Sequence, residues 1–218
     1  MKKIAVVLSG CGVYDGAEIY ETVITLLSIE EFGAKYQCIA PNIDQMHVIN
    51  HHTGEVSDNE CRNVLIESAR LARGDVIDLD QADPSDYDAL IIPGGFGAAK
   101  NLSDFAIQGE KSKAHDKLVE FSKEIHMQGK PVGLMCIAPA IAPFIFGEKV
   151  DFTIGSDVET AKTIESIGGV HRECDVSDIV VDEQHKVVTT PAYMSANSIS
   201  EAAVGIRKLV NKVVDLTA

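Results

Sequence analysis

The chain alternates short apolar runs with longer segments in which apolar residues recur every three or four positions. Short apolar runs are typical of buried strands, and the wider spacing is typical of helices with one buried face. We expect strands at 3–8, 36–40, 89–92, 132–135 and 152–154, and a hairpin of 178–181 with 186–190. Helices are expected at 18–32, from Asp58 or Asn59 to Arg73, from Ser112 to Gly129, at 138–146, after Asp157 and at 198–214, with a loop from Pro93 to about Gly109.

This order of elements predicts an α/β fold. Several expected strands are apolar throughout, which indicates a mostly parallel sheet with helices on both faces. The 218 residues, of which 45% are hydrophobic, suit a single domain over 1–218. The apolar run 4–8 is shorter than the roughly 7–15 residues of a signal peptide. No segment approaches the roughly 18 consecutive apolar residues of a membrane span, so we expect no membrane partner.

Charge and cysteine usage narrow the expected partners and compartment. The net charge of −14 and the pI near 4.8 oppose nucleic acids and anionic membranes. The odd number of cysteines, their irregular spacing and the absence of a Cys-x-x-Cys pair predict reduced thiols and no metal site. We therefore expect a cytoplasmic protein. The cysteines are Cys11, Cys38, Cys61, Cys136 and Cys174.

One cysteine lies where an expected strand meets an expected helix. In a parallel sheet, ligands bind outside the carboxyl ends of the strands, and Cys136 directly follows the strand 132–135. A tight turn there exposes a nucleophile to the positive end of a helix dipole and to a neighbouring N–H group, here that of Ile137. Cys136 is therefore a candidate nucleophile. The alternative is inert packing, because cysteine is among the most buried residue types.

Two other segments end at the same expected edge. Gly94 and Gly95 follow the strand 89–92, and paired glycines let backbone N–H groups turn toward a ligand, although they also suit a plain turn. Glu18 and Glu21 lie one turn apart at the start of the first expected helix, where either carboxylate could reach the sulfur. Acids at that position also complement a helix dipole without any catalytic role.

Three further residues are candidates for lining a substrate pocket. Cys11 lies in the glycine-rich loop after the first strand, at the same sheet edge, and could serve as a resolving thiol. Asn50 and His51 adjoin each other in a polar segment after the second strand. We expect these residues beside the pocket.

Several motifs together resemble the ThiJ/PfpI branch of the class I glutamine amidotransferase-like superfamily over nearly the whole chain. They are Gly-Ala-Glu-x-x-Glu-Thr after the first strand, Pro-Gly-Gly after a buried strand, and Cys-x-x-Pro after the next strand. Longer strings, among them "LSGCGVYDGAEI", "PGGFGAAKNLSDFA", "MCIAPA" and "VTTPAYM", resemble the enhancing lycopene biosynthesis protein family. The resemblance implies a flavodoxin-like fold with a nucleophile elbow at Cys136, and Glu21 ahead of Glu18 as the acid.

The same resemblance implies an activity. It is a glyoxalase that needs neither glutathione nor a metal or other cofactor, acts on glyoxal or methylglyoxal, and is associated with isoprenoid biosynthesis. Many ThiJ/PfpI members have His after the cysteine, where this chain has Ile137, and amidotransferases need a His-x-Glu that 188–200 lacks. Glutamine hydrolysis and proteolysis are therefore not expected.

The expected mechanism starts from a Cys136 thiol whose pKa is lowered to about 6, which is mostly thiolate at neutral pH. The thiolate adds to an aldehyde, the N–H groups of Gly95 and Ile137 receive the oxyanion, and a protonated Glu21 donates to sulfur and then moves a proton. The expected partners are a small α-oxoaldehyde and a second copy of the chain. A redox sensor or ligand-binding protein, and a deglycase of glycated amines, are the alternatives.

Overall fold

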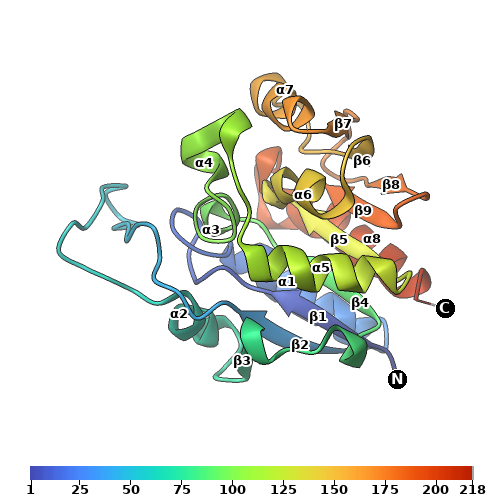
Figure 1. Ribbon diagram of the computed structural model, residues 1–218, viewed down its shortest axis with the longest axis horizontal. Helices are drawn as coiled ribbons and strands as arrows, with labels where there is room; N and C mark the ends of the chain where they lie inside the picture. The colour runs from blue at the N-terminus through green and yellow to red at the C-terminus, as the bar shows by residue number, and fades with distance from the viewer. Residues whose placement is uncertain (218) are drawn as a thin grey trace.

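A central sheet organises the molecule. The computed structural model describes residues 1–217, and within them seven strands form one sheet in the order β3–β2–β1–β4–β5–β9–β8 (Figure 1). Every neighbouring pair is parallel except β8 and β9, so the predicted mostly parallel α/β fold is confirmed. The strands are β1 (Lys3–Val7), β2 (Lys35–Ala40), β3 (Val76–Asp78), β4 (Ala89–Ile92), β5 (Val132–Met135), β8 (Val180–Asp182) and β9 (Val187–Thr190). The single domain expected over 1–218 stays a prediction, and residue 218 lies outside the described part.

Helices cover both faces of this sheet. Successive side chains of a strand point to opposite faces, and in β1 the side chains of Ile4 and Val6 pack in one core while those of Ala5 and Val7 pack in another. The first core includes α1 (Ile19–Glu31), α2 (Val64–Leu71) and α8 (Ile199–Asp215), and the second includes α5 (Asp116–Met127) and α6 (Ala142–Phe146).

Smaller elements pack at the carboxyl edge and against β8 and β9. They are α3 (Phe96–Lys100), α4 (Phe105–Gln108), α7 (Val158–Ser166) and a two-stranded parallel sheet of β6 (Val150–Phe152) and β7 (Gly169–His171). The predicted loop from Pro93 to Gly109 is thus wrong in part, because α3 and α4 lie within it. Among residues 1–217, no helix is both long and apolar enough to cross a membrane.

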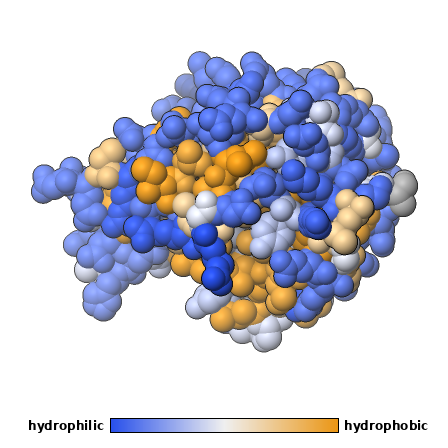
Figure 2. Space-filling view, turned by 90° about the horizontal axis from the view of Figure 1, so that it is seen from below, coloured by the Kyte–Doolittle hydropathy of each residue, from blue (hydrophilic) through white to orange (hydrophobic). Residues whose placement is uncertain are grey.

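The segment between β2 and α2 departs most from the predicted elements. The helix expected to begin at Asp58 or Asn59 begins only at Val64, where the Asn63 side chain accepts a hydrogen bond from the Ile66 N–H. Isolated bridges, one of them pairing Ile49 with Val56, hold the preceding residues extended. The segment projects from the body in Figure 1, and its tip is hydrophilic in Figure 2.

Candidate active site

Cys136 lies on a strained turn directly after β5. Its φ of 58° is in the left-handed region, which is uncommon for a residue with a side chain. Its N–H donates to the Thr190 carbonyl of β9 at 3.1 Å, and its side chain is 7% exposed. Such a turn aims a nucleophile away from the strand and toward the carboxyl edge of the sheet.

Gly94 allows the close approach of Cys136 and Glu21. A Cβ added at Gly94 would overlap the Cβ of Cys136 and lie 2.8 Å from Oε2 of Glu21. Glycine is therefore the residue that fits between the thiol and the carboxyl group. The N–H of Gly94 donates to Glu21 Oε2 at 2.8 Å, so it holds the acid rather than facing a ligand as expected from the sequence.

Glu21 is fully buried beside the sulfur. Its Oε1 accepts a second backbone hydrogen bond, 3.1 Å long, from the N–H of Tyr193. Burial raises the pKa of Glu21 to about 7, with a further contribution from the charge of Glu18, while the N–H donors and the Cys136 thiol act in the opposite direction. This carboxyl group can hold or release a proton near neutral pH.

Glu18 has a different role in the structure. Its side chain caps α1, with Oε2 accepting from the N–H of Glu21 at 2.6 Å. Burial raises the pKa of Glu18, and backbone hydrogen bonds from α1 lower it. The structure thus directs the Glu21 carboxyl group toward Cys136 and the Glu18 carboxyl group toward the start of its own helix.

The expectation of a lowered thiol pKa is wrong. Burial, followed by the charge of Glu21, raises the pKa of Cys136 well above its ordinary value, while the N–H groups of Gly95 and Ile137 lower it only in part. The helix expected at 138–146 is present as the 3₁₀ segment Ala138–Ile141 followed directly by α6, and the N–H of Ile137 at its start does not offset the burial of the thiol. The resting pair therefore consists of a thiol that donates to the Glu21 carboxyl group.

A cavity of about 250 Å³ opens beside the sulfur. Gly95 and Ile137 line it as expected, whereas Cys11, Asn50 and His51 lie outside it. Sequence reasoning missed most of its wall, because those residues come from distant segments. The signals available were the "VTTPAYM" string for Tyr193 and Met194, and the helix-cap pattern for Asp157. The cavity is lined by Val13, Gly95, Phe96, Cys136, Ile137, Asp157, Thr160, Tyr193 and Met194.

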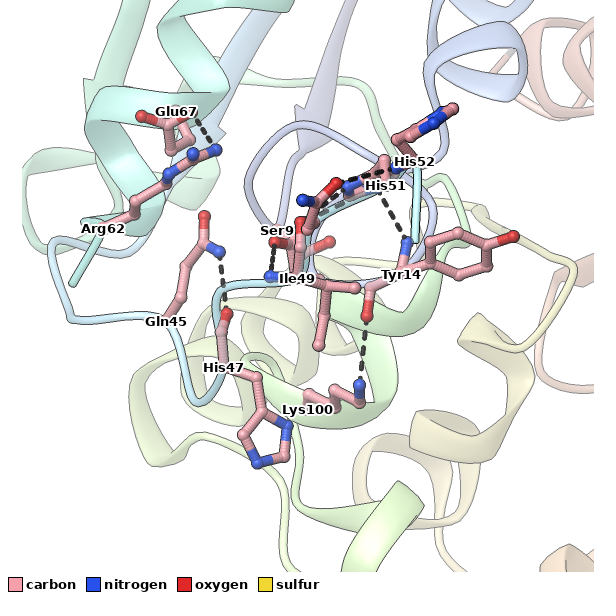
Figure 3. Close-up of polar contacts among 12 residues, drawn as sticks. Ser9, Tyr14, Gln45, His47, Ile49, His51, His52, Arg62, Glu67 and Lys100 are labelled. Carbon is pink, nitrogen blue, oxygen red and sulfur yellow. Dashed lines mark hydrogen bonds and ion pairs between the residues drawn. The ribbon is translucent and has the colours of Figure 1, made fainter. Parts of the chain in front are cut away.

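His51 belongs to a separate cluster, which Figure 3 shows. Its Nε2 accepts from the N–H of Tyr14 at 3.2 Å and lies 3.8 Å from Asp15, while its Nδ1 lies 3.0 Å from the carbonyl of Ile49. The Tyr14 and His51 rings pack at 5.0 Å, and Lys100 Nζ donates to the Tyr14 carbonyl. This cluster joins the loop after β1 to the projecting segment.

Cys11 and Asn50 have their neighbours elsewhere and do not line the cavity. The pKa of Cys11 is raised by burial and then by Glu67 of α2, which places this thiol on the α2 side of its loop. The Asn50 side chain accepts from the N–H of His52 within its own turn. Among residues 1–217, no group of three or more His, Cys, Asp or Glu side chains is arranged to hold a metal ion.

Solved structures of similar proteins share this architecture. The crystal structure of an isoprenoid biosynthesis protein with an amidotransferase-like domain from Ehrlichia chaffeensis is 34% identical, covers 98% of this chain and 99% of its own, and superposes with a TM-score of 0.90. Glyoxalase III from Candida albicans is 16% identical over 99% of this chain and 97% of its own, with a TM-score of 0.60. The similarity to glyoxalase III shows a shared fold.

Curated relatives cover the chain to different extents. The human glutamine amidotransferase-like class 1 domain-containing protein 3, mitochondrial, is 45% identical over 99% of this chain and 83% of its own. The rat ES1 protein homolog, mitochondrial, is 44% identical over 99% of this chain and 84% of its own. A deglycase from Thermococcus kodakarensis is 26% identical over 67% of this chain and 74% of its own.

These comparisons correct one expectation and identify the family. The predicted cytoplasmic location is contradicted, since the human and rat relatives are mitochondrial proteins. The cysteine pattern from which that location was predicted does not distinguish these compartments. The sequence model of the DJ-1/PfpI family matches residues 2–143, which include Cys136, Glu21 and Gly94. The chain belongs to the DJ-1/PfpI family.

Proposed function

We propose that this protein is a glyoxalase that converts glyoxal to glycolate, and methylglyoxal to lactate, without glutathione or a metal. The observation that carries the proposal is the pairing of the Cys136 thiol with the buried Glu21 carboxyl group at the wall of a small cavity. The shared fold of glyoxalase III supports an enzyme of this class.

The first step is addition of sulfur to one aldehyde carbon. The raised pKa of Cys136 means that the thiol keeps its proton until it attacks, and the Glu21 carboxylate accepts that proton as the carbon–sulfur bond forms. The N–H groups of Gly95 and Ile137, which face the sulfur, donate to the oxygen that becomes negative. Glu21 then gives this proton to the oxygen, which forms the hemithioacetal and returns Glu21 to its carboxylate form.

The second step moves a proton between the two carbons. Glu21 removes the hydrogen of the hemithioacetal carbon, which gives an enediolate, and a proton is returned to the neighbouring carbon. The resulting thioester of a 2-hydroxy acid is hydrolysed by water, which releases the acid and restores the thiol. One water molecule is consumed, and no electron acceptor or donor is needed.

A deglycase acting on glycated amines is the second candidate. It is supported by the name of the Thermococcus relative, and it uses the same thiol and carboxyl group. The redox-sensor alternative is less well supported, because oxidation of a cysteine follows its thiolate character and exposure, and Cys136 is buried with a raised pKa.

Two further expectations remain proposals. The name of the Ehrlichia protein supports an association with isoprenoid biosynthesis.

A homodimer is supported by the outer face of α1, where Tyr20, Val23 and Leu27 are 48%, 49% and 44% exposed. Light scattering of the purified chain should give twice the monomer mass, and Leu27→Glu should shift it to the monomer; a wild-type monomer would contradict the dimer.

The function is tested by product formation over time. Protein treated with chelator and freed of glutathione is incubated with glyoxal, and glycolate is measured by chromatography. We expect many equivalents of glycolate per protein chain. A single equivalent of aldehyde consumed without acid would fit a binding protein, and glycolate no faster than in protein-free buffer would overturn the proposal. A deglycase would instead release free amine from a glycated amine faster than it consumes glyoxal.

A further inference from the structure

A second hollow adjoins the cavity beside Cys136. It has a volume of about 360 Å³ and lies between α4 and α7. Phe96, Ile137 and Thr160 line both spaces, so the two meet at these three side chains. Small-molecule sites commonly have volumes of roughly 300–1,000 Å³, a range that the cavity reaches only together with the hollow.

The two walls of the hollow differ in chemistry. The α3–α4 wall is apolar and consists of Ala99, Phe105 and Ala106, and the α7 wall carries Glu159, Thr160 and Thr163. The ring of Phe96 stands 45% exposed at the junction with the cavity. An exposed aromatic ring beside an apolar wall provides a contact surface for an uncharged group.

Contacts on the side away from the hollow fix the position of Phe96. Its backbone N–H donates to the Val13 carbonyl at 2.7 Å, and Lys100 Nζ lies 5.1 Å from its ring centre. The same ammonium donates to the Tyr14 carbonyl. The ring is therefore placed by contacts outside the hollow, and Lys100 is already engaged there.

Charge restricts what the hollow accepts. Asp157 lines the cavity and Glu159 lines the hollow, and neither space has a Lys or Arg in its described lining. Hydrogen bonds from Thr160 lower the pKa of Asp157, so this carboxylate is ionised at neutral pH. Within residues 1–217, Glu159 makes no ion pair. An anionic substituent would be repelled by both side chains.

We propose that this hollow binds the substituent R of an α-oxoaldehyde R–CO–CHO, where R is an uncharged aryl or branched alkyl group. The inference rests on the proposed function. The aldehyde carbon would lie at Cys136, and R would pass between Phe96 and Ile137 toward Ala106. Glyoxal, which has no substituent, occupies the cavity alone.

The first test compares substrates. Initial rates give kcat/KM for phenylglyoxal, followed as mandelate, and for glyoxal, followed as glycolate. Ala106→Trp fills the hollow from an exposed position and should lower the phenylglyoxal-to-glyoxal ratio about tenfold. Ile107→Trp, the matched control on the same helix and outside the hollow, should leave the ratio unchanged. An unchanged ratio in Ala106→Trp would overturn the proposal.

A second test does not depend on turnover. Alkylation of Cys136 by iodoacetamide and by N-benzyl iodoacetamide is followed by peptide mass spectrometry of the full chain. Ala106→Trp should slow the benzyl reagent about tenfold and iodoacetamide less than about twofold. If the wild-type chain fails to turn over glyoxal, the proposed function is wrong. The alkylation rates still show whether the hollow accommodates the benzyl group. If Ala106→Trp slows both reagents equally, or slows neither, the proposed role of the hollow is wrong.

The charge of the hollow is tested with an anionic probe. Glu159→Lys should raise kcat/KM for 4-carboxyphenylglyoxal relative to phenylglyoxal about two- to fivefold, in line with the modest worth of exposed charge pairs. Glu120→Lys on α5 makes the same change in net charge away from the hollow and should not alter the ratio. A ratio that rises equally in both variants would contradict the assigned role of Glu159.

Discussion

Two clusters at the same carboxyl edge of the sheet use their hydrogen bonds in opposite ways. In the Cys136–Glu21 pair, backbone N–H groups hold the carboxyl group against a buried thiol, and the sulfur faces a cavity. In the His51 cluster, the ring is 37% exposed, and both nitrogens are engaged by backbone groups of Tyr14 and Ile49. A reactive side chain at the carboxyl edge of the sheet is therefore not enough for catalysis, because its reacting atom must also be free to contact the substrate.

One loop connects the two clusters. After β1, Val13 lines the cavity while Cys11 lies on the α2 side. β1 lies between β2 and β4 in the sheet, so its loop borders both neighbours. A Cβ at Gly12 would lie within 2.7 Å of the His51 ring, which shows how tightly the cluster closes on this loop. The His51 cluster thus supports a wall of the cavity from outside.

Replacing Cys136 should lower turnover more than any change in the His51 cluster. Cys136→Ser should abolish glycolate formation from glyoxal, because a serine hydroxyl is far less acidic than a thiol and Glu21, with a pKa of about 7, is too weak a base to activate it. Cys11→Ser should retain activity within about twofold. Retained turnover in Cys136→Ser, measured by chromatography of glycolate, would refute the assigned nucleophile.

Neutralising the buried acid should give the next largest effect. Glu21→Gln keeps the shape but cannot shuttle a proton, so kcat should fall about 10²–10⁴-fold. Removal of its charge lowers the pKa of Cys136, so iodoacetamide should alkylate this residue faster at pH 7 than in the wild type. Glu18→Gln can still cap α1 and should be nearly silent in both assays. If Glu18→Gln were the inactive variant, the acid would be one helical turn earlier.

The raised pKa of Glu21 predicts opposite pH trends for activity and stability. Activity should rise as the pH increases through about 7, because the carboxylate form accepts the thiol proton. The native state binds this proton more tightly than the unfolded chain, where the pKa is 4.5, so the free energy of unfolding should fall between pH 4.5 and about 7.

The size of this fall should be about 3 kcal/mol, from about 1.4 kcal/mol per unit of pKa. Urea unfolding at several pH values measures it, and the difference between wild type and Glu21→Gln isolates the contribution of this group. A difference that does not change with pH would show that Glu21 keeps an ordinary pKa.

The smallest effect is expected in the His51 cluster. His51→Ala removes the acceptor of the Tyr14 N–H and should lower the free energy of unfolding by about 1 kcal/mol, with glyoxal turnover within about twofold of the wild type. A tenfold loss of turnover with unchanged stability would mean that His51 contacts the substrate, contrary to its place outside the cavity.

Much of the fold was predictable because local patterns decide it. The strands 89–92 and 132–135 are apolar throughout, and the structure has β4 and β5 at those residues. Helices also begin after Asp157 and at Ser198 as expected, and in the structure both side chains cap them by accepting from N–H groups a few residues away. The start of α2 was missed, because several polar residues compete for the cap and the bridges that exclude the earlier ones join distant positions.

The sequence by itself determined the tight turn at Cys136, the glycine pair and the two acids at the start of α1, because turn and helix-start chemistry is local. Only the tertiary structure decided which acid meets the sulfur and which way the thiol pKa moves. Both depend on burial and on N–H donors such as that of Tyr193, which is 172 residues from Glu21 in the chain. Solvent exclusion and long-range hydrogen bonds arise when the strands assemble, and no short segment encodes them.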